Sequence, residues 1–182
     1  MNQMEDHIID ADKAETLEDE SRYRILSREE LLGEVADDDT VIDVGSGTGF
    51  FTDDIAEGAA EVYAVDFQTE MHDYYRQKGL PENVEIVHSR ASEIPIEDAD
   101  LIVSILSLHE IDVEGALQRF SEILGEGGEM FVVDWSANAE TDDVPPREKL
   151  YSAADASEAV SELFDVIEAK ERFDTFKLIA EV

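Results

Sequence analysis

The sequence predicts an α/β fold in which a mostly parallel sheet is covered by helices on both faces, and three observations support this prediction. Short apolar runs alternate with amphipathic stretches from about residue 40 onward. These runs are almost continuously apolar, as is typical of parallel strands buried on both faces. The first run ends in three glycines at alternate positions, where an open α/β sheet often carries its ligand-binding turn.

Each element follows from its local pattern. Five runs rich in branched residues are expected to be strands, at 41–44, 62–65, 84–87, 101–106 and 130–133. A capping box at 27–30 predicts a short helix ahead of the first strand. Apolar residues at helical spacing in 116–124 predict a helix that begins after Asp112 and stops at Gly125. Residues 164–173 and 176–182 predict a strand hairpin.

Length and composition indicate one domain. The 182 residues suffice for one core but are short for a second substrate domain. We therefore expect a single domain over 1–182, with a helical lead-in at 1–36 and an α/β core at 37–182. The absence of cysteine excludes disulfides, thiolate nucleophiles and cysteine-ligated metals. The four histidines have no ligand-like spacing, so no metal site is expected.

The charge balance is the most unusual bulk property. The chain has 47 acidic and 13 basic residues, which gives a formal net charge of -34. Because molar salt shortens the screening length to ~3 Å, this surface suits a salt-loving organism, and we expect a haloarchaeal source. Nucleic acid and anionic lipid are poor partners for such a surface. No apolar run approaches the ~20 residues that a membrane helix needs, so a cytoplasmic protein without membrane insertion is expected. Oligomeric state is not indicated.

The strongest local motif is the strand and turn at 41–51, which carries Gly45, Gly47 and Gly49. Glycine permits tight turns and close approach of a ligand to the backbone. A dinucleotide-binding loop would have glycine where Phe50 stands, which disfavours a nicotinamide-dependent oxidoreductase. The next predicted strand ends in Asp66, where open α/β folds present a carboxylate to ribose hydroxyls. Asp66 is also suited to cap the helix that follows.

Two further segments complete the pattern. Residues 100–111 form a strand that runs into a polar loop containing Leu108, His109 and Glu110, and residues 127–135 form a glycine turn and a strand ending in Asp134 and Trp135. The four segments in this order resemble class I S-adenosylmethionine-dependent methyltransferases over essentially the whole chain. Within that class, the sequence is most similar to the small type 11 enzymes related to ubiquinone and menaquinone methylases. This resemblance implies a Rossmann-like, three-layer α-β-α fold with a seven-stranded sheet whose last strand is antiparallel.

The resemblance also implies a cofactor, S-adenosylmethionine, over the carboxyl ends of the first four strands. The glycine loop would line its methionyl and ribose portions, Asp43 would support the loop or the amino group, and Ser104 would touch the methionine end. Phe67 and Met71 offer apolar surface beside the sugar and base, or belong to the core. The expected cofactor residues are Asp43, Gly45, Ser46, Gly47, Gly49, Asp66, Phe67, Met71, Ala91, Ser92 and Ser104.

One position departs from the family pattern. Family members carry an acid for the adenine amino group where this chain has Arg90. Arginine cannot accept a hydrogen bond, so adenine recognition falls to backbone groups near Ala91, to Ser92, or to a shifted alignment. This departure keeps open a second hypothesis, a cofactor-binding protein without catalysis.

Methyl transfer requires positioning more than a protein nucleophile. If the acceptor is a hydroxyl or an acidic carbon, His109 is the best-placed base, although a histidine there can equally orient a loop. Tyr23, Trp135 and Arg147 are candidates for the wall of the acceptor pocket, or are half-buried aromatics and a surface cation. The acceptor is expected to be a small molecule that the sequence does not identify.

Overall fold

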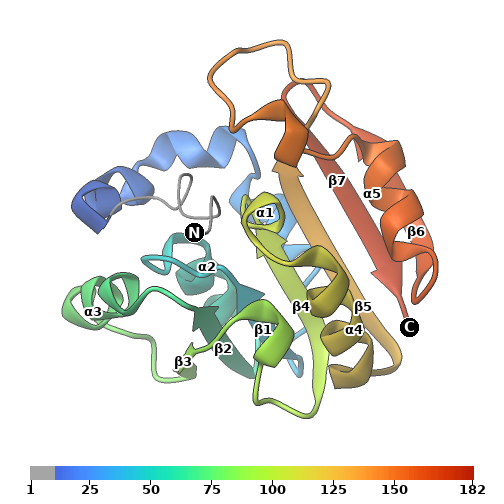
Figure 1. Ribbon diagram of the computed structural model, residues 1–182. Coiled ribbons are helices and arrows are strands. Elements are labelled where there is room, and N and C mark those ends of the chain that lie inside the picture. Colours follow the sequence, from blue (N-terminus) through green and yellow to red (C-terminus); the bar gives the residue numbers. More distant parts are fainter. Residues whose placement is uncertain (1–10) are drawn as a thin grey trace, which may run out of the picture.

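The computed structural model describes residues 11–182, so His7 and the first ten residues of the expected lead-in lie outside the described part. Its centre is a seven-stranded sheet with the order β3-β2-β1-β4-β5-β7-β6 (Figure 1). Only β7 is antiparallel to its neighbours, which confirms the predicted sheet. The strands are β1 (Thr40–Val44), β2 (Glu61–Asp66), β3 (Val84–His88), β4 (Ala99–Ile105), β5 (Leu124–Trp135), β6 (Asp165–Glu171) and β7 (Thr175–Glu181).

Two apolar clusters pack on opposite faces of this sheet. One joins alternate strand residues such as Ile42 to the buried faces of α4 and α5, including Phe120 and Val160. The other joins the neighbouring strand residues, such as Val41, to α1 and α2 through Leu31 and Ile55. The α-helices are α1 (Arg28–Leu32), α2 (Phe50–Gly58), α3 (Thr69–Lys78), α4 (Val113–Ile123) and α5 (Ala153–Val160). The arrangement is the three-layer, Rossmann-like fold that was predicted.

The ends of two helices show how local signals and long-range pairing combine. Ser27 caps α1, because its hydroxyl accepts a hydrogen bond from the Glu30 amide at 3.2 Å, but the Glu30 carboxylate pairs with Arg172, so only half of the predicted capping box is formed. The helix α4 begins after Asp112, although this side chain makes no capping hydrogen bond. The glycines expected to follow α4 as a turn are instead part of β5, which starts at Leu124. Leu124 pairs with Ala99, the Val182 amide donates to the Gly128 carbonyl, and the Gly127 amide donates to the Val182 carbonyl. These contacts hold the glycine segment extended.

The lead-in lies over the turn between β1 and α2. It contains two 3₁₀ helices, η1 (Ala11–Glu18) and η2 (Glu20–Arg24). The Thr48 hydroxyl donates to the Glu18 carboxylate, and Lys78 of α3 bridges Glu18 and Asp53 at 3.1 and 2.8 Å. The segment is therefore attached to the glycine turn and to two core helices. In residues 11–182, no helix has the length and apolar character needed to cross a membrane.

The last two strands form the predicted hairpin and one edge of the sheet. The pairing of β6 with β7 shifts register between Val166 and Glu168, which marks a bulge in the edge strand. The exposed residues of this region include Ile167 and Phe173.

Candidate active site

The sheet order reverses between β1 and β4, and the residues predicted to bind a ligand surround this point. Gly45, Gly47 and Gly49 all have positive φ, at 76°, 55° and 82°. A Cβ atom on Gly45 would lie 2.2 Å from Ser107 Oγ, and one on Gly49 would lie 2.2 Å from the Tyr75 ring. Glycine is therefore required at both places by conformation and by space.

Asp66 ends β2 and holds this loop. One carboxylate oxygen accepts from the Gly47 amide at 2.9 Å, and the other accepts from the Gln68 amide at 2.8 Å, next to the start of α3. Burial raises the pKa of Asp66, while these amide hydrogen bonds oppose the rise. The carboxylate thus anchors the turn and the start of the helix together. Its expected bond to a ribose stays a prediction.

A pocket opens at the carboxyl ends of β1 and β2. It is lined by Val44, Gly45, Val65, Asp66, Phe67, Gln68, Ser89, Ala91, Ser107, Glu110 and Ile111. Of the residues predicted to bind the cofactor, it brings together Gly45, Asp66, Phe67 and Ala91. Both ionisable side chains in its lining are carboxyl groups, so the pocket favours a cationic ligand.

Two buried hydroxyls near this pocket have no hydrogen-bond partner among the described residues. They are Ser46 Oγ, in the glycine turn, and Ser104 Oγ, near the end of β4. Their residues are 9% and 0% exposed. Buried polar atoms are normally satisfied, so these hydroxyls fit a ligand with several polar groups, and both stand at positions that the sequence assigned to the cofactor.

The other expected cofactor residues lie around the pocket without lining it. Asp43 is buried beneath the turn, accepts from the Thr52 hydroxyl at 2.6 Å, and has its pKa raised to about 6 by burial. Met71 is 1% exposed and belongs to the core. Ser92 lies in the short helix η3 (Ala91–Glu93) and packs against Gly115. Arg90 is exposed, and its guanidinium carbon lies 5.6 Å from the Phe67 ring centroid.

His109 lies in a buried carboxylate cluster. In the helix η4 (Leu108–Glu110), its Nδ1 lies 2.8 Å from Asp134 Oδ1, and its amide donates to Asp134 Oδ2 at 2.9 Å. His109 Nε2 lies 3.7 Å from Glu110 Oε1. Burial lowers the pKa of His109, but Asp134 and Glu110 outweigh burial and raise it overall. The ring does not line the pocket, whereas the neighbouring carboxyl of Glu110 does.

The residues predicted for the acceptor pocket have other partners. The Tyr23 hydroxyl donates to Asp54 at 2.8 Å, and its ring packs on Phe50 and Phe51. Arg147 donates to the carbonyls of Ala137, Ala139 and Thr141 and so braces the loop after β5. Trp135 is partly exposed at the end of β5, beside Asp134. An acceptor role for these side chains stays a prediction.

Sequence reasoning missed Glu110, Ser107 and Asp134 as parts of the site. The available signal was the His109–Glu110 pair after a strand, together with the acid that ends the fifth strand. Leu106, between them, is the one non-glycine residue with positive φ in the described part of the chain, at 56°. This turn brings Ser107 Oγ within 3.3 Å of the Gly45 carbonyl. Backbone strain of this kind often marks functional sites.

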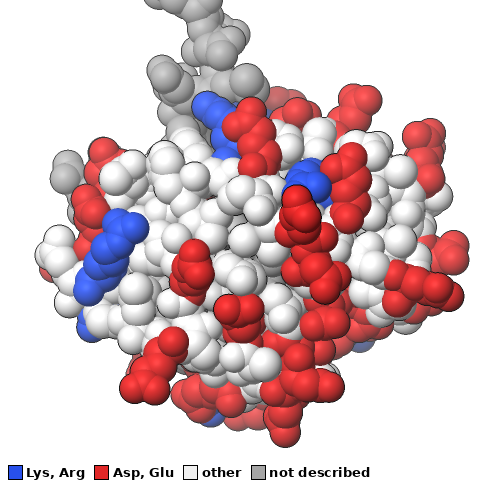
Figure 2. Space-filling model, turned by 90° about the horizontal axis from the view of Figure 1, so that it is seen from below, with Lys and Arg blue, Asp and Glu red and all other residues white. Residues whose placement is uncertain are grey.

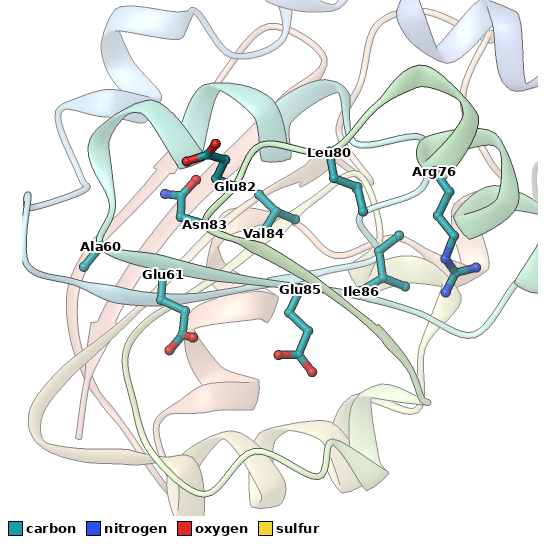
Figure 3. A pocket seen from close by; sticks show the side chains of 9 residues that line it. All are labelled: Ala60, Glu61, Arg76, Leu80, Glu82, Asn83, Val84, Glu85 and Ile86. Atoms are coloured by element: carbon teal, nitrogen blue, oxygen red, sulfur yellow. The ribbon is translucent and has the colours of Figure 1, made fainter.

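A second groove runs beside the edge strand β3, away from the carboxyl ends of the strands (Figure 3). It is lined by Ala60, Glu61, Arg76, Leu80, Glu82, Asn83, Val84, Glu85 and Ile86. Its lining contains three glutamates and Arg76 but no histidine or hydroxyl side chain. Among residues 11–182, no group of three His, Cys, Asp or Glu side chains could hold a metal ion. His72 and His88 pack edge to face at 6.0 Å between ring centroids.

Comparisons with known proteins agree with this geometry. A solved S-adenosylmethionine-dependent methyltransferase from Aquifex aeolicus is 28% identical, with a TM-score of 0.84 over 95% of this chain and 98% of that chain. A chain in the complex of the Haloferax volcanii methyltransferase activator Trm112 with a methyltransferase has a TM-score of 0.77 at 16% identity, over 94% of this chain and 96% of that one, and shows the fold alone.

Curated relatives match part of the chain. An uncharacterized methyltransferase of Mycobacterium tuberculosis is 33% identical over 102 residues, which is 55% of this chain and 41% of the relative. The chain therefore spans about two fifths of that relative's length. The family model described as a methyltransferase domain, type 11, matches residues 42–132. The chain belongs to this methyltransferase family, and its cofactor is S-adenosylmethionine.

Proposed function

We propose that this chain transfers the methyl group of S-adenosylmethionine to a small acceptor by direct displacement. The observation that carries the proposal is the glycine turn at the sheet's switch point, held by Asp66 and flanked by the unpartnered hydroxyls of Ser46 and Ser104. These groups suit a ligand with a ribose and an amino acid end. The chain resembles the Aquifex enzyme over nearly its full length, which supports the same reaction class.

The residues contribute chiefly by binding and orientation. The bound cofactor supplies a methyl group on a positively charged sulfur. The glycine turn would line the methionyl and ribose portions of the cofactor. Asp66 would bind the ribose hydroxyls, and Ser104 would bind the amino acid end. The carboxyl groups of Asp66 and Glu110 give the pocket a negative potential, which favours the cation before transfer over the neutral product. Such positioning supplies ~7 to 11 kcal/mol when the reacting atoms are well aligned.

Adenine would lie beside Phe67 and Ala91, which are both in the pocket lining. Arg90 covers the Phe67 ring from outside and offers only donors. In this arrangement backbone carbonyl groups near Ala91 would accept from the adenine amino group in place of the carboxylate found in other family members. Arg90 contributes by stacking on Phe67, so its substitution by alanine is expected to weaken binding without abolishing it.

The acidic surface of the molecule supports a small acceptor and a salt-adapted cytoplasm. Figure 2 shows Asp and Glu spread over the visible face with few Lys or Arg among them. A protein of net charge -34 repels nucleic acid strongly at moderate salt. This opposes an RNA acceptor, although the ribosomal RNA small subunit methyltransferase A of Thermococcus sibiricus is 28% identical over 82 residues, 45% of this chain and 30% of the relative. The haloarchaeal source remains part of the proposal.

Calorimetric titration of S-adenosylhomocysteine into the full chain in molar potassium chloride tests the cofactor site. We expect micromolar binding by the wild type and at least about tenfold weaker binding by Asp66→Ala, since both the turn and the ribose would lose a carboxylate. Asp66→Asn retains one acceptor oxygen and should fall between them. The matched control is Asp98→Ala, which removes an exposed carboxylate between η3 and β4.

Two outcomes would contradict the proposal. Binding of a nicotinamide dinucleotide in preference to S-adenosylhomocysteine would favour an oxidoreductase. A chain that binds S-adenosylhomocysteine but transfers no labelled methyl group to any component of a cell extract from a halophile would be a binding protein without catalysis.

A further inference from the structure

The cluster formed by Asp134, His109 and Glu110 connects the core of the sheet to the pocket. Asp134 is the next-to-last residue of β5, and its side chain is 2% exposed. It accepts hydrogen bonds from the amides of His109 and Trp135 and contacts the His109 ring. These contacts fix the orientation of the imidazole. The His109 side chain is 5% exposed, so it has no open path to a ligand.

Glu110 is the member of this cluster that reaches the pocket. Its carboxyl lies 3.7 Å from His109 Nε2, its side chain is 20% exposed, and it belongs to the pocket lining with Gly45, Asp66 and Ser107. Because Nδ1 of the imidazole is engaged by Asp134, Nε2 is the nitrogen that faces Glu110. Asp134 and His109 together therefore fix the position of the Glu110 carboxyl, at the point where β1, β2 and β4 meet.

The charges around Glu110 come from several elements. Burial raises the pKa of Glu110 to about 7; His109 and Lys149 of η5 (Arg147–Lys149) lower it, while Asp134 of β5 and Asp66 of β2 raise it. A carboxyl that titrates near neutral pH can both accept and release a proton, as a general base must.

We propose that Glu110 is the general base of the methyl transfer, that His109 positions its carboxylate, and that the acceptor carries a proton on its attacking atom, as a hydroxyl or a protonated amine does. This proposal rests on the methyl transfer proposed above. The acceptor atom forms a bond to the methyl carbon, and the carbon–sulfur bond breaks with its electron pair left on sulfur. The proton of the acceptor passes to the Glu110 carboxylate and later to solvent. No other reactant is needed.

The test uses the charge of the cofactor, so it does not depend on knowing the acceptor. S-adenosylmethionine carries a positive sulfur and S-adenosylhomocysteine does not. A base that reaches the acceptor must lie near the methyl group, and it therefore senses this charge. We would titrate both compounds into the full chain in molar potassium chloride between pH 6 and 8. The affinity for S-adenosylmethionine divided by the affinity for S-adenosylhomocysteine should rise by about tenfold as Glu110 ionises, because the carboxylate attracts the positive sulfur.

The variants separate the roles. Glu110→Gln should keep S-adenosylhomocysteine binding and show a ratio that is flat with pH, while Glu114→Gln, an exposed carboxylate on α4, should behave as the wild type. His109→Asn removes a positive neighbour of Glu110, so the midpoint of the ratio should move to higher pH. A merely structural role for His109 would leave that midpoint unchanged.

The outcomes for the two proposals differ. A wild type that binds neither compound would overturn the methyltransferase proposal itself. A wild type that binds S-adenosylhomocysteine but shows a flat ratio, or the same pH dependence in Glu110→Gln, would overturn the role of Glu110 alone.

Discussion

Carboxyl groups held inside the fold at single positions make the protein sensitive to pH. Glu110 has a pKa of about 7, and an unfolded glutamate ionises near 4.5. Between these values the folded protein binds more protons than the unfolded chain, so stability falls as pH rises. Below the unfolded pKa both states are protonated and the penalty vanishes.

Glu110→Gln is therefore expected to be more stable than the wild type at pH 8, by at most about 3 kcal/mol, and equal to it near pH 4. Urea unfolding at several pH values and constant potassium chloride measures this difference. A stability difference between the two proteins that does not change with pH would contradict the burial of an ionisable carboxyl at this site.

Glycines of this chain allow conformational strain to be separated from steric overlap. Gly125 has open space around it and no unusual φ. Gly127 also has open space, but its φ is 82°. Gly49 has the same φ as Gly127, and a Cβ atom on Gly49 would lie 2.2 Å from the Tyr75 ring. Substitution by alanine should cost little at Gly125, about 1 kcal/mol at Gly127, and a further ~1 to 3 kcal/mol at Gly49. Urea midpoints rank the three variants, and equal costs at Gly49 and Gly127 would refute the overlap.

A partly buried arginine, Arg22, helps to fix the lead-in. Arg22 lies 4.8 Å above the Phe51 ring and donates to the Leu17 carbonyl at 2.9 Å, and burial lowers its pKa. These contacts join η1 and η2 to the first turn of α2. They act together with the contacts of Glu18 with Thr48 and Lys78 to keep this segment over the glycine turn.

Arg22→Ala should loosen the lead-in with little effect on the sheet. Loss of about 1 to 2 kcal/mol of local stability corresponds to roughly 5- to 30-fold faster amide exchange in residues 11–24. Exchange measured by mass spectrometry compares this variant with Arg24→Ala, an exposed arginine nearby. Faster exchange spread evenly over the whole chain would instead indicate a global loss of stability.

Most elements could be predicted from sequence because their signals are local. The strands were visible as continuous apolar runs, and the glycine turn was visible from its spacing. The extension of β5 through Gly125 to Gly128 was not visible, since it depends on pairing with the chain end at Val182. Glu110 was missed for a similar reason, because its neighbour His109 is oriented by Asp134, which lies 25 residues from His109 in the sequence.

Salt is expected to stabilise the whole molecule. With 47 acidic and 13 basic residues, repulsion outweighs the attraction of ion pairs such as Lys177 to Glu168 at 2.7 Å. Salt screens both the repulsion between carboxylates and the attraction within ion pairs. Because the repulsion is the larger of the two, added salt should raise the stability of the fold.

The melting temperature should therefore rise with potassium chloride and approach a plateau near 1 M, where the screening length is ~3 Å. Differential scanning calorimetry from roughly 0.1 to 2 M, over which the screening length falls from ~10 Å to below ~3 Å, follows this rise. Sucrose at matched viscosity is the control for changes that do not involve charge. A melting temperature that falls with salt would mean that the ion pairs dominate.

The bulge between Val166 and Glu168 has a consequence for solubility in brine. Edge strands are commonly kept from pairing with other chains by charged side chains, and concentrated salt weakens that protection. A bulge distorts the hydrogen-bonding edge itself, and this geometric barrier does not depend on ionic strength. The irregularity in β6 thus guards this edge of the sheet against growth into fibrous aggregates under the conditions in which repulsion between molecules is lost.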